Sequence, residues 1–144
     1  MKMDVKKILV PIDGLESSYK AARYALRLAK LNEANVTLLY VTTIPYFPRY
    51  FESLENYVMK VKEEAEEWFN KIRSFEEAKE VNIDQVVNTS ALSIVEGILS
   101  IAEEGKFDLI VISPRGRSTF KRLLLGSVTS GVVTYSTIPV LVYR

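Results

Sequence analysis

Three short apolar runs constrain the fold of this chain more than any other feature of its sequence. They occupy residues 7–13 (KILVPID), 107–113 (FDLIVIS) and 139–144 (PVLVYR), and each is rich in Ile, Val or Leu. Continuous runs of this kind are typical of strands covered on both faces, which occur in parallel sheets. The sequence therefore predicts a parallel sheet with a buried centre.

Helical patterns separate these runs along the chain. Residues 16–32 place Ala21, Ala25 and Ala29 at helical spacing, which predicts a helix that lies close on the sheet. Three further segments share a helical spacing of apolar residues: 51–79, which contains neither Gly nor Pro, 90–104, which Gly105 ends, and 126–136. Two more strands are predicted at 35–43 and 81–89, and the polar alternation of the second favours a place near a sheet edge.

The order of these segments predicts the fold class. Four strand–helix pairs and a last strand are typical of an α/β protein with a doubly wound, five-stranded parallel sheet and helices on both faces. The chain has 144 residues, 48% of them hydrophobic, so one domain over residues 1–144 is expected. In such sheets ligands bind outside the carboxyl ends of the strands, where the strand order reverses.

Missing residue types exclude several kinds of chemistry. The chain has no Cys and no His, which excludes disulfides, thiol nucleophiles, Cys/His metal sites and Ser-His-Asp triads. The net charge of +1 argues against a nucleic-acid partner, and no apolar stretch has the length of a membrane span. No targeting segment is recognisable, so a cytoplasmic protein is expected.

A basic cluster follows the apolar run at 107–113. Four basic residues fall within eight positions: Arg115, Arg117, Lys121 and Arg122. Gly126 and Ser127 come next, at the start of a predicted helix, where free N–H groups attract anions. These residues are a candidate phosphate site, and the alternative is a solvated basic loop with Ser127 as a helix N-cap.

Asp13 is the second candidate, because it ends the run at 7–13. A carboxylate at the end of a strand can hold ribose hydroxyls, whereas the simpler interpretation is a turn residue or a helix cap. The sequence contains neither a Gly-x-x-x-x-Gly-Lys-Ser/Thr loop nor a Gly-x-Gly-x-x-Gly motif. Ordinary P-loop hydrolases and classical dinucleotide oxidoreductases are therefore not expected.

Together these segments resemble the universal stress protein family over essentially the whole chain. Residues 7–14 (KILVPIDG) look like the opening signature of that family, and residues 116–128 with 138–142 look like its closing one. In nucleotide-binding members the closing motif is glycine, two residues, glycine, nine residues, glycine, then Ser or Thr. Gly116, its nine-residue spacer, Gly126 and Ser127 match this motif. The resemblance implies a flavodoxin-like fold with strand order 3-2-1-4-5, in which the first and fourth strands are neighbours.

The resemblance also implies a ligand and the residues that hold it. ATP is expected, with magnesium or manganese, and protein ligands alone would form no metal site. Pro11, Asp13 and Val41 would line the adenine and ribose, with Asp13 on the ribose hydroxyls. The phosphates would lie against residues of the closing signature: Gly116, Gly126 and Ser127, with Arg115 or Arg117 adding charge.

One position departs from the family pattern. Ser113, counted here among the site residues, stands where the first glycine of the closing motif is expected, and Pro114 follows it. Glycine serves where the backbone must approach a ligand, so a side chain there could crowd the ribose. A hydroxyl that bonds to the ligand is the alternative.

Two further segments carry predictions. Residues 46–51 contain four aromatic residues, Tyr46, Phe47, Tyr50 and Phe51, which form either a lid over the nucleotide or a packing contact with the long helix. The last strand, from Val140 to Tyr143, offers an open sheet edge. Because the family typically dimerises through this edge, a homodimer is expected.

The expected function is an ATP-binding regulatory domain of the stress response that works as a homodimeric switch without efficient chemistry. The alternative is a dimeric scaffold that has lost nucleotide binding and works through protein contacts. Slow ATP hydrolysis comes third, because Asp13 could hold a metal-bound phosphate but no catalytic residue or general base is identified.

Overall fold

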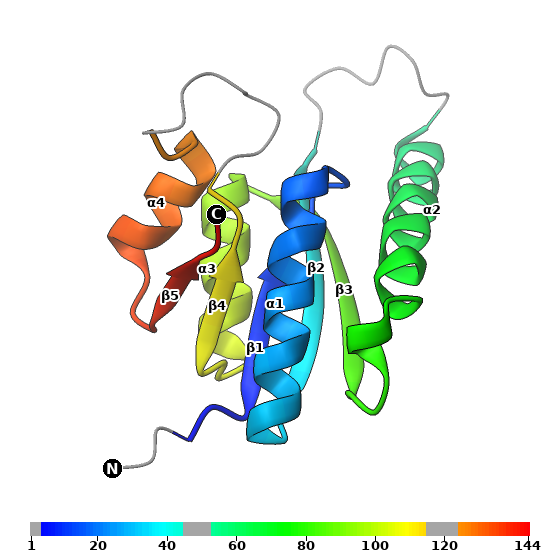
Figure 1. The fold of residues 1–144 in the computed structure, drawn as a ribbon. Coiled ribbons are helices and arrows are strands. Elements are labelled where there is room, and N and C mark those ends of the chain that lie inside the picture. The colour runs from blue at the N-terminus through cyan, green and yellow to red at the C-terminus, as the bar shows by residue number, and fades with distance from the viewer. Residues whose placement is uncertain (1–3, 45–52, 115–123) are drawn as a thin grey trace.

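The structure is a computed structural model, of which residues 4–44, 53–114 and 124–144 are described. Strands and helices alternate along the chain (Figure 1). The elements are β1 (Lys7–Pro11), α1 (Glu16–Asn32), β2 (Asn35–Thr43), α2 (Leu54–Arg73), the 3₁₀ turn η1 (Glu76–Ala78), β3 (Ile83–Ala91), α3 (Ile94–Glu104), β4 (Leu109–Ile112), α4 (Ser127–Tyr135) and β5 (Val140–Val142).

The five strands form one sheet in the order β3-β2-β1-β4-β5, and every neighbouring pair is parallel. This confirms the predicted doubly wound α/β sheet and its strand order. The chain moves outward from β1 to β3 and then returns to place β4 on the other side of β1, so the order reverses between β1 and β4. That reversal is where a doubly wound sheet binds its ligand.

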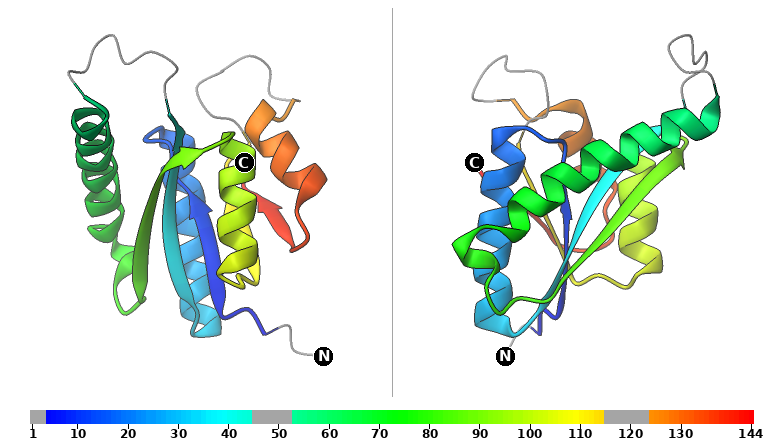
Figure 2. Two further views of the ribbon diagram at one scale, coloured as in Figure 1. Left: turned by 180° about the vertical axis from the view of Figure 1, so that it is seen from behind. Right: turned by 90° about the vertical axis from the view of Figure 1, so that its right-hand side faces the viewer.

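Helices cover both faces of the sheet, as predicted. One face packs against α1 and α2 through a core that includes Ile8, Val10 and Leu38. The other face packs against α3 and α4 through Leu9, Leu39 and Ile110. The right-hand view of Figure 2 shows α1 and α3 on opposite sides of the strands.

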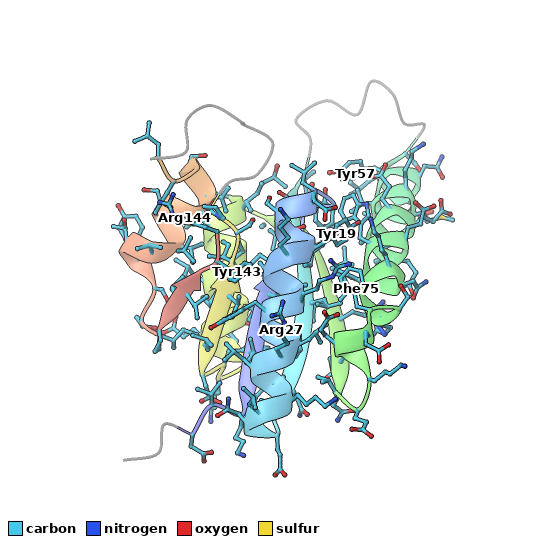
Figure 3. All side chains as sticks on the ribbon, viewed as in Figure 1. Tyr19, Arg27, Tyr57, Phe75, Tyr143 and Arg144 are labelled. Carbon is cyan, nitrogen blue, oxygen red and sulfur yellow. The ribbon has the colours of Figure 1, made fainter. Side chains whose placement is uncertain are left out.

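The prediction of one long helix over residues 51–79 is wrong at the carboxyl end of the helix. The helix α2 ends at Arg73, and a 3₁₀ turn follows at Glu76–Ala78. Between them Phe75 takes an extended conformation and is 9% exposed, with its ring edge-on to Tyr19 and beneath the guanidinium of Arg23. The chain leaves the helix because this turn buries Phe75 against α1 (Figure 3).

The third helix begins later than predicted, because Ser90 and Ala91 extend strand β3. Helix α3 then begins after Ser93, whose hydroxyl accepts a hydrogen bond from the Glu96 N–H at 3.1 Å and caps the helix. At the other end Gly105 stays right-handed, and it is Lys106 that takes the left-handed conformation with a φ of 53°. The predicted place of 81–89 at a sheet edge is confirmed, since β3 is the outermost strand beyond β2.

The two edge strands of the sheet, β3 and β5, differ in the hydrogen bonds that their outer edges make. On β3 the guanidinium of Arg73 donates to the Ile83 carbonyl at 3.0 Å and to the Gln85 side chain at 2.9 Å, and Gln85 donates to Glu66 at 2.6 Å. These bonds from α2 occupy part of the outer edge of β3. On β5, Pro139 and Tyr143 bond with β4, so the alternate residues Val140 and Val142 turn their main-chain groups outward.

No helix in the described parts of the chain is long and apolar enough to cross a membrane.

We expect Phe69→Ala to lower the free energy of unfolding by about 3–5 kcal/mol. The Phe69 ring on α2 is fully buried in the core on the face of the sheet that α1 and α2 cover. Met59→Ala on the same helix is the control, since Met59 is 59% exposed and its loss should change stability by less than about 0.5 kcal/mol. Urea denaturation followed by circular dichroism measures both, and equal losses would contradict the packing described here.

Candidate functional site

A cavity of about 500 Å³ lies at the carboxyl ends of the strands, where the strand order reverses. Its size is within the range of small-molecule sites. The walls come from the ends of β1, β2 and β4, from the start of α3 and from the start of α4. The lining residues are Pro11, Ile12, Asp13, Leu39, Tyr40, Val41, Thr42, Thr43, Ile94, Ile98, Ile112, Ser113, Gly126, Ser127, Val128 and Thr129.

Six residues that the sequence singled out line this one cavity: Pro11, Asp13, Val41, Ser113, Gly126 and Ser127. Pro11 and Asp13 are about a hundred residues from Ser113, Gly126 and Ser127 in the chain, and Val41 comes from β2. The pairing of β1 with β4 brings the two segments together. Arg115, Gly116 and Arg117, and the aromatic segment at 46–51, lie outside the described residues.

Asp13 sits in a tight turn between β1 and α1. Its Oδ1 accepts a hydrogen bond from the Leu15 N–H at 3.0 Å, so the carboxylate stabilises the turn and is not the cap of α1. Gly14 has a φ of 83°, a conformation that glycine adopts without strain. A Cβ on Gly14 would also collide with the indole of Trp68, which packs against the turn from α2. Trp68 of α2 therefore supports the turn that places Asp13 in the cavity wall.

The Asp13 carboxylate also acts on a neighbouring phenol. Burial raises the pKa of Tyr19, and the nearby carboxylates of Glu16 and Asp13 raise it further. Both effects disfavour a phenolate, so Tyr19 remains neutral at physiological pH and adds no charge beside the turn.

The start of α4 forms the opposite wall. Gly126 is the N-cap and makes no side-chain capping bond, and Ser127 is the first helical residue. The prediction of Ser127 as an N-cap is wrong, because the helix begins one residue earlier than that role requires. The first N–H groups of a helix have no intrahelical acceptors, and here they border the cavity together with the Ser127 side chain.

The end of β4 is tied to α4 by a buried hydrogen bond. The Thr129 hydroxyl donates to the Ser113 carbonyl at 2.7 Å, and the Gly126 N–H donates to the Pro114 carbonyl at 2.8 Å. Ser113 is 6% exposed and lies in the cavity wall. These two bonds fix the position of Ser113 relative to the start of α4.

The third wall is the end of β2, which extends beyond its neighbour. The last paired residues of β1 and β2 are Pro11 and Leu39, whereas β2 continues to Thr43. The register of β2 with β3 shifts between Val41 and Thr43, as in a β-bulge. Val41 therefore borders the cavity beside the strand end where β1 has stopped.

Tyr57 of α2 holds the end of β2 in place. Its hydroxyl lies 2.8 Å from the Thr42 Oγ1 and donates to the Thr43 carbonyl at 3.1 Å, and its ring stands at the top of α2 in Figure 3. Two residues before Thr42 on β2, the ring of Tyr40 packs edge-on to Trp68. The helix α2 thus contacts both the turn of Asp13 and the end of β2.

Sequence reasoning missed several residues of the cavity. Ile94 and Ile98 fit the apolar face of a helix, and that pattern is the same whether a residue meets the sheet or a cavity. Thr129 gave no signal, because its partner is a main-chain carbonyl 16 positions away. Tyr40 belongs to a strand that was predicted at 35–43, but the place where β1 stops beside it could not be predicted.

In the part of the chain that the structure describes, no group of three or more acidic residues is arranged to hold a metal ion. Asp13 is thus a single carboxylate in a site of main-chain amides, hydroxyls and apolar side chains.

Comparison with known proteins identifies the family. The profile of the Universal stress protein family matches residues 4–144. The chain belongs to this family. It is 34% identical to universal stress protein MJ0531 of Methanocaldococcus jannaschii over 143 residues, which cover 96% of this chain and 82% of that protein.

Solved structures of universal stress proteins have the same fold. MJ0577 of M. jannaschii superposes with a TM-score of 0.79 at 30% identity, over 97% of this chain and 96% of that one. Two more distant structures contain adenine nucleotides. One universal stress protein is in complex with cAMP (TM-score 0.73, 22% identity, 99% of each chain), and one from Archaeoglobus fulgidus is in complex with dAMP (TM-score 0.72, 19% identity, 99% and 100%).

We expect Gly14→Ala to destabilise the protein by more than about 1 kcal/mol, because alanine is strained at positive φ and its Cβ would displace Trp68. In a Trp68→Phe background the smaller ring leaves more room, so the same substitution should cost less. Urea denaturation followed by circular dichroism measures the four proteins. An additive result would show that Trp68 does not support the turn.

Proposed function

We propose that this universal stress protein binds an adenine nucleotide, with ATP as the ligand of its working state, and that it acts as a regulatory domain. The observation that carries the proposal is the cavity at the strand reversal. It combines apolar walls from β2 and α3, one carboxylate from the end of β1 and an uncapped helix N-terminus from α4. Base, ribose and phosphate each need one of these surfaces.

The base fits the apolar side of the cavity. Val41, Ile94 and Ile98 present aliphatic side chains there, and such surfaces favour a flat aromatic ring. The exposed end of β2 adds main-chain polar groups beside Val41, because β1 stops at Pro11. Main-chain donors and acceptors at such a place can fix the orientation of a base.

The ribose fits Asp13. The Leu15 N–H occupies one position on Oδ1, and a carboxylate has about four lone-pair sites, so further donors can bond to it. Ribose hydroxyls are donors of this kind. Ser113 also lines the cavity, and its main chain is held by Thr129, so we assign its hydroxyl as a further contact for the sugar.

The phosphates fit the start of α4. Main-chain N–H groups and the positive end of the helix dipole attract anions by about 0.3–1 kcal/mol or more, and the Ser127 hydroxyl adds a donor. The chain that leads into α4 carries Arg115, Gly116 and Arg117, which we assign to the phosphates from the family motif. Magnesium or manganese would arrive with the phosphates, since the described residues offer no carboxylate cluster for it.

The ligands of related structures support this assignment. The proteins solved with cAMP and with dAMP share the fold of this chain, and both ligands contain adenine. We assign no catalytic residue, because the described residues that line the cavity include a single carboxylate and no Lys. A binding switch needs no general base.

We expect millimolar ATP with magnesium to raise the melting temperature of the purified protein. At a hundredfold excess over Kd the stabilisation is about 2.7 kcal/mol, which corresponds to roughly 6–12 °C for a chain of this size. Asp13→Ala should abolish the shift. Differential scanning calorimetry measures it, and isothermal titration calorimetry gives Kd.

Two controls separate binding from folding. Asp13→Asn keeps an acceptor for the Leu15 N–H, so it should preserve the turn and lose about tenfold in affinity with the charge. Asp84→Ala removes an exposed carboxylate on β3 and should leave binding unchanged. If wild-type protein shows no shift and releases no nucleotide on denaturation, the dimeric scaffold becomes the better account.

The proposed switch is a homodimer that forms through β5. The two sheet edges support this choice, because bonds from α2 occupy part of the outer edge of β3 whereas Val140 and Val142 direct main-chain groups outward from β5. Unpaired strand edges readily pair with another chain. Tyr143 stacks on Tyr24 with ring centroids 4.7 Å apart, which holds the end of β5 against α1.

We expect Val142→Pro to convert a dimer into a monomer, because proline removes an outward N–H that β5 offers to a partner strand. Val142→Ala is the matched control, since it trims the side chain and keeps the N–H. Size-exclusion chromatography with light scattering measures the mass of each. A wild-type monomer, or a dimer that persists in the proline variant, would show that β5 is not the interface.

A further inference from the structure

Helix α3 lies unusually close to the end of β2, and one glycine allows it. An ideal Cβ built on Gly97 would lie 2.5 Å from the Val41 Cγ1 and 2.9 Å from the Ala91 Cβ. Separations this short do not occur between real side chains, so no larger residue fits without a shift. Glycine is among the poorest helix formers, and this close approach gives its presence inside α3 a structural reason.

The close approach shapes the cavity. Val41 is 5% exposed and lines the cavity, and so do Ile94 and Ile98, which flank Gly97 on α3. Residues three or four positions apart share one face of a helix, so the face that carries Gly97 also carries the wall. Gly97 itself is not in the lining and touches the cavity only through Val41.

A Cβ at position 97 would displace the Val41 side chain more than the helix, because the contact with Val41 is shorter than the contact with Ala91. Ile98 is 1% exposed and Ala102 is 3% exposed, so α3 is held by its own core contacts over two turns. Moving α3 outward would break these contacts, whereas Val41 borders free volume on its cavity side. The displaced Val41 side chain would therefore narrow the space between β2 and α3.

We propose that Gly97 is a positioning residue that sets the width of the cavity between β2 and α3, through Val41, and so the size of the ring that the cavity admits. The identity of that ring as a purine rests on the function proposed above. With glycine at this position the space between β2 and α3 accepts a two-ring base. With alanine it would favour a single ring.

The test compares ATP and CTP in four proteins: wild type, Gly97→Ala, Val41→Ala and the double variant. We expect Gly97→Ala to weaken ATP binding at least tenfold by isothermal titration calorimetry and to lower the ratio of ATP to CTP affinity at least fivefold. In the Val41→Ala background the same substitution should cost less than threefold, because the shorter contact, with the Val41 Cγ1, is gone and only the 2.9 Å contact with the Ala91 Cβ remains. Equal losses in both backgrounds would overturn the proposal.

Gly131→Ala is the matched control. A Cβ on Gly131 of α4 would lie 2.8 Å from the Val95 Cγ2, so it makes a comparable collision between helices. Val95 does not line the cavity. We expect this variant to change ATP affinity and the ATP-to-CTP ratio less than twofold, and a loss equal to that of Gly97→Ala would assign the effect to general packing.

A readout without nucleotide separates this inference from the proposed function. Methyl NMR of the ligand-free proteins should show the Val41 resonances shifted in Gly97→Ala and unchanged in Gly131→Ala. If Val41 stays in place in Gly97→Ala, the inference fails even where ATP binds. If Val41 moves but wild type binds no nucleotide, the proposed function fails and the control of cavity width by Gly97 stands.

Val41→Leu covers the case in which Gly97→Ala does not fold. It leaves Gly97 in place and adds volume to the same wall from β2. We expect it to lower the ratio of ATP to CTP affinity at least fivefold, and an unchanged ratio would show that the width at Val41 does not select the base.

Discussion

The double burial of β1 is the constraint on which the rest of this structure depends. Ile8, Leu9 and Val10 are each fully buried, with alternate side chains pointing to opposite faces, and the strand pairs with β2 on one side and β4 on the other. A strand buried in this way needs a helix layer on each face. Its carboxyl end is then the point where two halves of the chain meet. The position of the cavity follows from that, because β1 stops at Pro11 while β2 continues beyond it.

Different helices and strands hold the different side chains of the site in place. Asp13 is held in its turn by the Leu15 N–H and supported by Trp68, and Ser113 is held by Thr129 of α4. The helix α2 lies on the opposite face from α3, yet it contacts both the turn and, through Tyr57, the end of β2. A ligand that displaced the turn of Asp13 or the end of β2 would therefore act on α2, whose outer surface is rich in glutamate. These contacts would connect occupancy of the cavity to the surface of α2, as the regulatory role proposed above requires.

The sequence predicted most of the fold because its signals are local. Apolar runs marked the buried strands β1 and β4, the alternation in 81–89 marked an edge strand, and small residues marked the face of α1 that meets the sheet. The apolar run at 139–144 was wrongly expected to be covered on both faces, because β5 lies at the other sheet edge and is half-buried. Errors occurred where a distant contact decides a boundary. Phe75 leaves the helical path because burial against Tyr19 and Arg23 of α1 outweighs continued helix, and no local pattern carries that information. Ser90 and Ala91 remain in β3 because the strand continues beside β2 through a register shift.

The sequence by itself determined the α/β class, the strand and helix content, and the residue types that any chemistry here can use. Through its resemblance to a family it also indicated the strand order and the residues at the strand ends. Only the tertiary structure decided that Asp13, Val41 and Ser113 share a cavity with the start of α4, and that Ile94 and Ile98 complete it. It also decided that Gly97 matters, because a missing Cβ has meaning only when the atom it would meet, on Val41, comes from another strand. Periodicity reports which face of an element is buried, whereas the partner on that face is set by packing across the whole chain.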